Sequence, residues 1–265
     1  MSRIQSTFQR LAERREKALI AYVMAGDPTL EDTEDYVLQL AQAGADVIEL
    51  GVPFSDPIAD GPVIQQAAER ALRSGTTLKK ILATVRSLRA KTQIPLVLMA
   101  YYNSIFRYGE AAFCRDAVSA GVDGLIVPDM PPEEAGTIHP LAEAAGLDVI
   151  FLLAPTSTAK RETAVARLSR GFIYYVSLTG ITGAKLTDKA DVEKKVREIR
   201  GYAKTPVAVG FGIATPDDAR AVARIADGVI VGSALVKLIA EGGHAAVTDR
   251  LSSFTRSLKA SMLSA

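Results

Sequence analysis

Hydrophobic residues recur along the chain in short runs, and each run is followed by a segment whose apolar positions have helical spacing. Most runs are apolar at successive positions, which is typical of strands covered on both faces. The runs lie at residues 19–23, 46–51, 95–100, 123–127, 148–153, 172–177, 206–209 and 228–231. The helical segments lie at residues 31–43, 62–73, 110–120, 132–145, 158–169, 189–200, 215–225 and 234–240.

Eight strand-then-helix units predict an α/β fold, namely a (β/α)8 TIM barrel. Ile4, Phe8 and Leu11 recur at helical spacing and predict an extra N-terminal helix, while residues 244–261 predict an extra C-terminal one. No linker rich in Pro, Gly or Ser divides the chain, so residues 1–265 are expected to form a single domain. A doubly wound open sheet is the alternative, but the barrel fits the strand count better.

Charge and composition exclude several classes of function. The chain has 31 Lys and Arg against 30 Asp and Glu, which argues against nucleic-acid or anionic-membrane partners, because both need a basic surface. One Cys and two His make a metal site improbable. No apolar run approaches the ~20 residues of a membrane span. The basic start contains Glu13 and Glu16, unlike a signal peptide, so we expect a cytoplasmic protein.

Carboxylates are the remaining candidates for chemistry, because the eight runs contain neither Lys nor His. Glu49 lies within the run 46–51, and period-two alternation places it on the opposite face from Ile48 and Leu50. If those two residues face the helices, Glu49 points into the barrel. An apolar environment would raise its pKa and make it a proton donor or acceptor near neutrality. The alternative is a structural salt bridge inside the barrel.

The loop after this strand carries a second candidate carboxylate, Asp60. One interpretation is that Asp60 caps the helix that Pro62 opens. The other is that Asp60 and Glu49 converge above the barrel, where two carboxylates in different environments divide acid and base work.

Glycine-rich turns occupy the last three loops that follow strands, at residues 179–184, 210–213 and 232–234. These loops are neighbours at the rim of a barrel, where backbone N–H groups and a helix N-terminus form a phosphate site. Tight turns without a ligand are the alternative. The longer segment 177–190 is interpreted as a lid, or else as a long rim loop. The aromatic loop 101–108 lines the pocket, meets a protein partner, or packs locally.

The strongest motif is ELGVPFSDPIADGP at residues 49–62. Supporting motifs are AGDP at 25–28, IVPD at 126–129, PPEE at 131–134, TGITG at 179–183, GFGI at 210–213 and GSA at 232–234. In this order and spacing they make the sequence similar to the tryptophan synthase alpha subunit family over nearly its whole length.

The resemblance implies a reaction, the retro-aldol cleavage of indole-3-glycerol phosphate to indole and glyceraldehyde 3-phosphate. It implies that Glu49 is the general acid and base, and that Asp60 pairs with the indole N–H and stabilises the charge developing there. Neither a Schiff base nor a metal is required. Other phosphosugar-binding barrels, such as an isomerase of the same pathway, share only the last glycines and are an alternative.

The resemblance also implies the remaining site residues. Tyr174 lies near Glu49 and the glycerol part of the substrate, and Thr182 is the lid threonine that closes toward Asp60. The phosphate is bound by the backbone of Gly183, Gly212, Gly232 and Ser233, and also by the Ser233 hydroxyl. Candidates for the apolar indole pocket are Tyr22, Ile64, Tyr102 or Tyr101, and Phe211 or Ile230.

A partner follows from the same resemblance. The family works with a beta subunit in a complex of two alpha and two beta chains, and indole passes to it through a tunnel. Pyridoxal phosphate belongs to that partner, and no cofactor is expected in this chain. The loops 53–60, 101–108 and 177–190 are expected to face the beta subunit or to respond to it.

The chain departs from the family pattern at Met24 and Val63, where Thr is common, and at Ala100, where a larger apolar residue is common. These positions bear on pocket packing or on communication between subunits. Two alternatives concern function: a free-standing lyase that needs no partner, and a non-catalytic activator of the beta subunit. Retention of both Glu49 and Asp60 argues against the activator.

Overall fold

Parallel strands close into a barrel in the computed structural model, which describes residues 1–176, 189–210 and 212–263. Within these residues the sheet has nine strands in the order β5-β4-β3-β2-β1-β9-β8-β7-β6. Their bounds are β1 Ala18–Met24, β2 Val47–Gly51, β3 Leu96–Met99, β4 Gly124–Ile126, β5 Asp148–Ile150, β6 Leu152–Leu153, β7 Ile173–Val176, β8 Val207–Gly210 and β9 Gly228–Val231.

The barrel closes through the predicted strand 148–153. The structure divides this strand at Phe151: β5 pairs with β4, and β6 pairs with β7. The two ends of the sheet are therefore consecutive pieces of one chain segment. The predicted α/β barrel is confirmed, and the ninth strand arises from this division rather than from an additional unit.

Alternation along the strands separates two cores. Outward residues such as Ile48 and Leu50 pack in one cluster with Val37 and Leu40 of the surrounding helices. Inward residues such as Val47 form a second cluster inside the barrel. The expected orientation of the β2 side chains is confirmed, and it directs every second side chain of each strand into the barrel.

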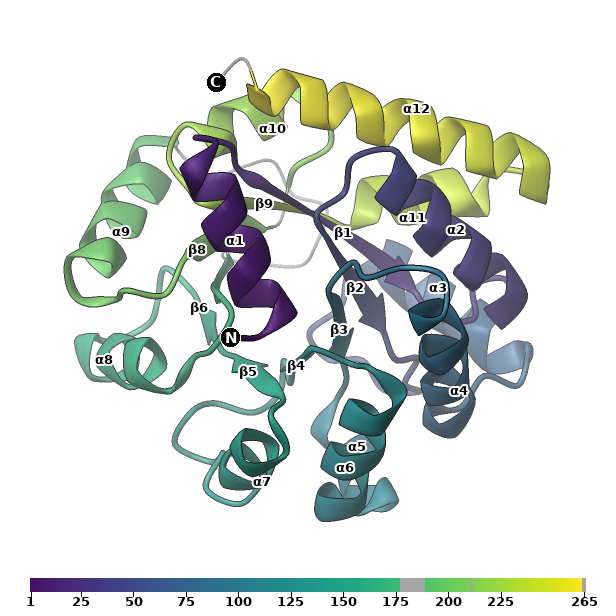
Figure 1. Cartoon of the computed structure of the whole chain (residues 1–265), viewed down its shortest axis with the longest axis horizontal. Coiled ribbons are helices and arrows are strands. Elements are labelled where there is room, and N and C mark those ends of the chain that lie inside the picture. Colours follow the sequence, from purple (N-terminus) through teal and green to yellow (C-terminus); the bar gives the residue numbers. More distant parts are fainter. Residues whose placement is uncertain (177–188, 211, 264–265) are drawn as a thin grey trace.

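Helices surround the strands (Figure 1). Their bounds are α1 Arg3–Glu13, α2 Leu30–Gln42, α3 Pro62–Arg73, α4 Leu78–Arg89, α5 Tyr102–Tyr108, α6 Glu110–Ala120, α7 Ile138–Ala145, α8 Ala159–Leu168, α9 Lys189–Tyr202, α10 Pro216–Ala223, α11 Ser233–Ala240 and α12 His244–Leu263. The predicted extra helices at both ends are confirmed as α1 and α12. In the described part of the chain no helix has the length and apolar character needed to cross a membrane.

Three helices differ from the sequence prediction. Residues 102–108 form the short helix α5 rather than a loop, and α7 begins only at Ile138 instead of at 132. The unpredicted α4 buries an apolar stripe at helical spacing and begins after Thr77, whose side chain accepts a hydrogen bond from the Lys80 N–H. The sequence signal for α4 was therefore present, because a capping Thr before such a stripe is typical of a helix start.

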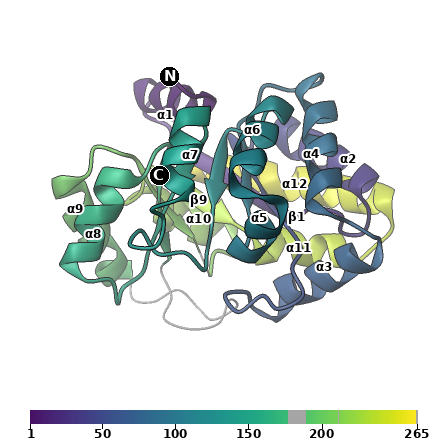
Figure 2. The same ribbon diagram turned by 90° about the horizontal axis from the view of Figure 1, so that it is seen from below.

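The N-terminal end of the barrel is filled by α1. Ile4, Phe8 and Leu11 join the interior cluster, and the rings of Phe8 and Phe172 lie 5.8 Å apart. Ser2 caps the helix in a capping box and donates a hydrogen bond of 2.5 Å to Asp148. Figure 2 shows α1 at one end of the molecule and α3 toward the other, so the chemistry is left to the C-terminal ends of the strands.

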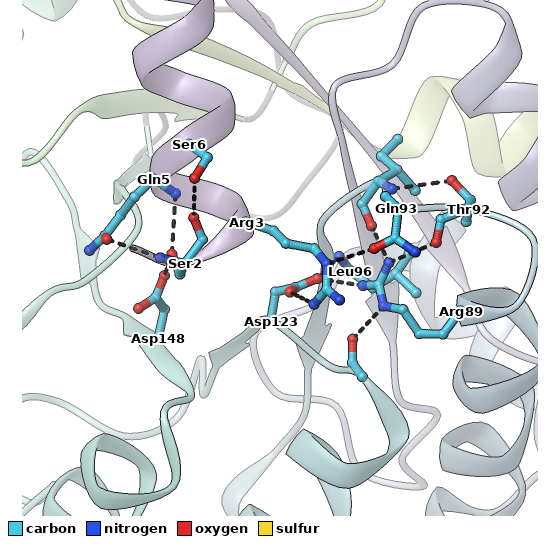
Figure 3. Close-up of polar contacts among 12 residues, drawn as sticks. Ser2, Arg3, Gln5, Ser6, Arg89, Thr92, Gln93, Leu96, Asp123 and Asp148 are labelled. Atoms are coloured by element: carbon cyan, nitrogen blue, oxygen red, sulfur yellow. Dashed lines mark hydrogen bonds and ion pairs between the residues drawn. The ribbon is translucent and has the colours of Figure 1, made fainter.

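A buried carboxylate, Asp123, ties this end of the barrel together (Figure 3). Its side chain is 4% exposed and pairs with Arg3 at 2.9 Å and with Arg89. It also accepts a hydrogen bond of 2.8 Å from the Leu96 N–H at the start of β3. One side chain thus joins α1, α4 and two neighbouring strands.

Replacing Asp123 is expected to destabilise the protein strongly. Asp123→Ala should lower the free energy of unfolding by about 3 kcal/mol, because the guanidinium of Arg89 stays buried without its partner. Urea denaturation measures this value. Glu69→Ala is the control, because it removes an exposed ion pair with Arg73 and should cost less than ~0.5 kcal/mol. Equal losses in the two variants would contradict the assignment.

Candidate active site

A cavity of about 760 Å³ lies at the C-terminal ends of the strands. Its volume is in the range of small-molecule sites. The strands and the turns that directly follow them contribute one part of its lining: Tyr22, Glu49, Met99, Tyr174, Gly212, Ile213, Ile230, Gly232 and Ser233. Asp60 and Ile64, from the loop after β2 and from α3, complete this part.

Glu49 is buried at the floor of this cavity. Its side chain projects from β2, in register with Tyr22 on β1 and Val97 on β3, and the residue is 1% exposed. Neither carboxyl oxygen has a hydrogen-bond partner among the described residues, so the alternative of a structural salt bridge is not observed there. Burial, with a smaller contribution from the charge of Asp60, raises the pKa of Glu49 to about 8.

Asp60 lies at the edge of the cavity on the loop that follows β2. The N-cap of α3 is Gly61, without a side-chain cap, so the interpretation of Asp60 as the capping residue is wrong. Burial raises the pKa of Asp60 to about 6, and a hydrogen bond from the Tyr101 hydroxyl partly opposes that rise. The same hydroxyl accepts a hydrogen bond of 2.9 Å from the Ala59 N–H. Tyr101 therefore holds the loop and the carboxylate together.

Two tyrosines face the carboxylates, and a glycine makes room for each. A Cβ atom on Gly51 would lie 2.1 Å from the Tyr22 hydroxyl, and one on Gly210 would lie 2.6 Å from the Tyr174 hydroxyl. Burial, together with the charges of the two carboxylates, raises the pKa of each phenol well above its usual value. Both phenols are therefore neutral at physiological pH and keep their O–H groups as hydrogen-bond donors.

The far side of the cavity consists of backbone turns. Gly212 has a φ of +76°, which favours glycine, and Gly232 precedes the first residue of α11. The N-terminus of α11 has no side-chain cap, so its backbone N–H groups are available to an anion. Ser233 lines the cavity at this helix start. Gly183, Thr182 and Phe211 lie outside the described residues, as do positions 177–188 of the predicted lid 177–190. Its last two residues belong to α9.

The structure brings most of the predicted residues into one cavity, but it leaves Tyr102 out. The Tyr102 hydroxyl donates a hydrogen bond of 2.9 Å to Glu110, away from the cavity lining. Its neighbour Tyr101, the stated alternative, is the tyrosine that contacts Asp60. Ile230, the alternative to Phe211, lines the cavity.

Sequence reasoning missed several lining residues. Met99 was detectable, because it lies two positions after the inward-facing Val97. Ile213 and Ala234 belong to the glycine-rich turns 210–213 and 232–234 but were not named as site residues. The others come from the end of the turn after β8 and from the region of helices α10 to α12, where no local pattern marks a cavity wall: Ala214, Thr215, Asp218, Lys237, Leu238, Glu241 and Phe254. In the described ranges no group of three or more His, Cys, Asp or Glu residues is placed to hold a metal ion.

The departures from the family pattern lie in apolar packing. Met24 is buried in a cluster with Tyr22 and Ile64, and Val63 packs against the same cluster. Ala100 belongs to the outer core. Met24 and Val63 therefore affect the packing around Tyr22 and Ile64, two residues that line the cavity.

Relatives of the chain share its whole length. The family model for the tryptophan synthase alpha chain matches residues 8–262. The tryptophan synthase alpha chain of Citrifermentans bemidjiense is 55% identical over 263 residues, covering 99% of this chain and 98% of the relative. That of Geotalea daltonii is 54% identical over 260 residues, covering 98% of each.

Solved structures agree with these relatives. The crystal structure of tryptophan synthase subunit alpha from Legionella pneumophila has a TM-score of 0.94 at 39% identity and covers 100% of both chains. A chain of Mycobacterium tuberculosis tryptophan synthase has a TM-score of 0.91 at 39% identity and covers 98% of both. Fold, cavity and relatives lead to one conclusion: the chain belongs to the tryptophan synthase alpha chain family.

Proposed function

We propose that this cavity cleaves indole-3-glycerol phosphate to indole and glyceraldehyde 3-phosphate. The observation that supports this most directly is the buried carboxyl of Glu49, whose pKa of about 8 lies above that of Asp60, about 6. Near pH 7 Glu49 is mostly protonated and Asp60 mostly ionised. Two carboxyl groups of one cavity therefore hold different protonation states, so that one can donate a proton while the other stabilises a positive charge.

Glu49 accounts for both proton transfers of the reaction, and Asp60 stabilises the charge that develops between them. Glu49 donates its proton to C3 of the indole, which makes the ring an electron sink for the breaking C–C bond. The side-chain hydroxyl then loses its proton to the Glu49 carboxylate as the aldehyde forms. Asp60 accepts a hydrogen bond from the indole N–H and stabilises the positive charge that develops there.

The phosphate site in this proposal is the backbone at Gly212, Gly232 and Ser233, with the Ser233 hydroxyl and, by resemblance, Gly183. An uncapped helix N-terminus favours an anion through its dipole and its N–H groups. Tyr174 is assigned to the glycerol part, and Thr182 to closure toward Asp60. Tyr22, Ile64 and Ile230 are the apolar contacts of the indole ring.

Glu49→Gln should reduce indole release at least ~100-fold, because the amide cannot transfer the proton. Binding of glyceraldehyde 3-phosphate should change less than about twofold, since the phosphate turns are intact. Indole release and equilibrium binding measure the two effects. Glu69→Gln, on the exposed face of α3, is the matched control and should keep the parental rate. Parental indole release by Glu49→Gln would rule out this mechanism.

The pH dependence of kcat/KM should be bell-shaped. Activity should fall below about pH 6 as Asp60 gains a proton, and above about pH 8 as Glu49 loses its proton. The substrate phosphate also titrates near pH ~6. Carboxyl 13C NMR of the free protein therefore shows whether the lower pKa of the profile belongs to Asp60. Asp60→Asn removes a negative charge and should lower the pKa of Glu49. An unchanged or higher Glu49 pKa in that variant would contradict the coupling.

We also propose that a beta subunit docks beside the cavity. Ile58 and Phe106 are 85% and 65% exposed, and they follow β2 and β3 at the end of the barrel where the cavity lies. Large exposed apolar side chains near a site favour a protein partner. The proposed complex has two alpha and two beta chains in the cytoplasm. Its pyridoxal phosphate is held by the beta subunit.

Phe106→Asp should weaken association with the beta subunit at least ~10-fold, because a charge would be buried in the interface. Indole release by the isolated chain should stay at the parental rate. Leu263→Asp, at the exposed end of α12, is the control. Calorimetric titration measures association, and turnover with and without the beta subunit distinguishes a subunit from a free-standing lyase. Equal binding of both variants would contradict this docking surface.

A further inference from the structure

Beyond the glycine turns, the cavity lining comes from the region of helices α10, α11 and α12. It includes the N-cap of α10, Thr215, together with Asp218 of α10, Lys237 and Leu238 of α11, and Phe254 of α12. None of these side chains has a role in the acid-base chemistry. They line the same cavity as the glycine turns, so a charged side chain among them acts on a ligand held at those turns.

Lys237 is the single cationic side chain among the described residues that line the cavity. Four carboxyl groups line it as well, at Glu49, Asp60, Asp218 and Glu241. A phosphate monoester carries a charge of about −1.5 to −2 at pH 7. An acidic lining opposes the entry of such a ligand unless a positive charge compensates it.

Lys237 lies on α11, the helix that begins at the phosphate turn of Gly232 and Ser233. Lys237 lies four residues after Ser233, so the two side chains share one helix face. Side chains of a helix also tilt toward its N-terminus. Both residues line the cavity, and the N-terminus between Gly232 and Ser233 has no side-chain cap. Lys237 is exposed to solvent and lies about one helical turn from the uncapped N–H groups.

The neighbouring carboxylates are already engaged. Asp218 accepts hydrogen bonds from the Thr215 N–H and hydroxyl in the capping box of α10. Glu241 lies 3.9 Å from Arg250. Across the described residues no ion pair is formed by Lys237, whereas Lys259 pairs with Asp46 at 2.8 Å. The ammonium of Lys237 is thus available to an anion in the cavity.

We propose that Lys237 is a substrate-binding residue that attracts and holds the phosphate group of the substrate. The identity of the substrate in this inference rests on the proposed function. The binding of an anion by Lys237 rests on the cavity lining. Since the phosphate charge does not change as the C–C bond breaks, the interaction is equally strong in the ground and transition states. It therefore lowers KM and leaves kcat unchanged.

Kinetics of Lys237→Gln, Lys237→Arg and Lys79→Gln test the proposal. At low ionic strength Lys237→Gln should raise KM about fivefold to tenfold with kcat changed less than about twofold, and at ~0.5 M salt the difference in KM should fall below about twofold. Lys237→Arg should restore KM. Lys79→Gln, which removes an exposed charge from α4 outside the cavity lining, should have no effect.

Binding of glycerol 3-phosphate, followed by 31P NMR, separates this inference from the proposed reaction. Lys237→Gln should weaken that binding by the same factor as KM, while the affinity for indole stays at the parental value. If the protein binds glycerol 3-phosphate through Lys237 but releases no indole, the proposed reaction fails and the inference stands. Unchanged binding in Lys237→Gln, equal weakening in Lys79→Gln, or no binding by the parent protein would overturn it.

Discussion

The burial of one carboxyl group, that of Glu49, is the constraint on which the rest of the site depends. A carboxylate without a partner in an apolar interior is costly, and the protein meets that cost by raising the pKa of the group. The position of Glu49 is fixed by hydrogen-bonded neighbours on both sides of β2. The closed barrel thus provides a rigid strand on which an energetically unfavourable group stays in place.

The two ends of the barrel divide stability from chemistry. At the N-terminal end α1 fills the interior, and Asp123 and Asp148 have ionic or hydrogen-bonding partners. At the C-terminal end Glu49 has neither among the described residues. This contrast follows from the geometry of a parallel barrel, in which the inner layers fill with side chains and the loops after the strands remain free to vary. The paired carboxylates stabilise the fold, and the unpaired one is available to a substrate.

The sequence contained enough to predict the barrel and the position of Glu49, because both depend on short-range periodicity. It left the role of Asp60 open, since a helix cap and a cavity carboxylate share the same local pattern before Gly61 and Pro62. It also left open whether Tyr101 or Tyr102 belongs to the pocket. Only the start of α5 decides which ring faces Asp60, and the loop pattern did not predict that helix. No sequence pattern pointed to Lys237, because its place in the cavity lining depends on how three helices pack around one cavity.

The loops that follow β2 and β3 connect the exposed surface to the acid-base pair. Ile58 lies two residues before Asp60, and Phe106 belongs to the helix that starts directly after Tyr101. The Tyr101 hydroxyl bonds the Ala59 N–H, and its ring stacks on Phe54 at 5.1 Å. A protein that covered Ile58 and Phe106 would therefore contact the two segments that Tyr101 joins beside Asp60. Because the charge of Asp60 raises the pKa of Glu49, any shift of this contact changes the proton donor as well.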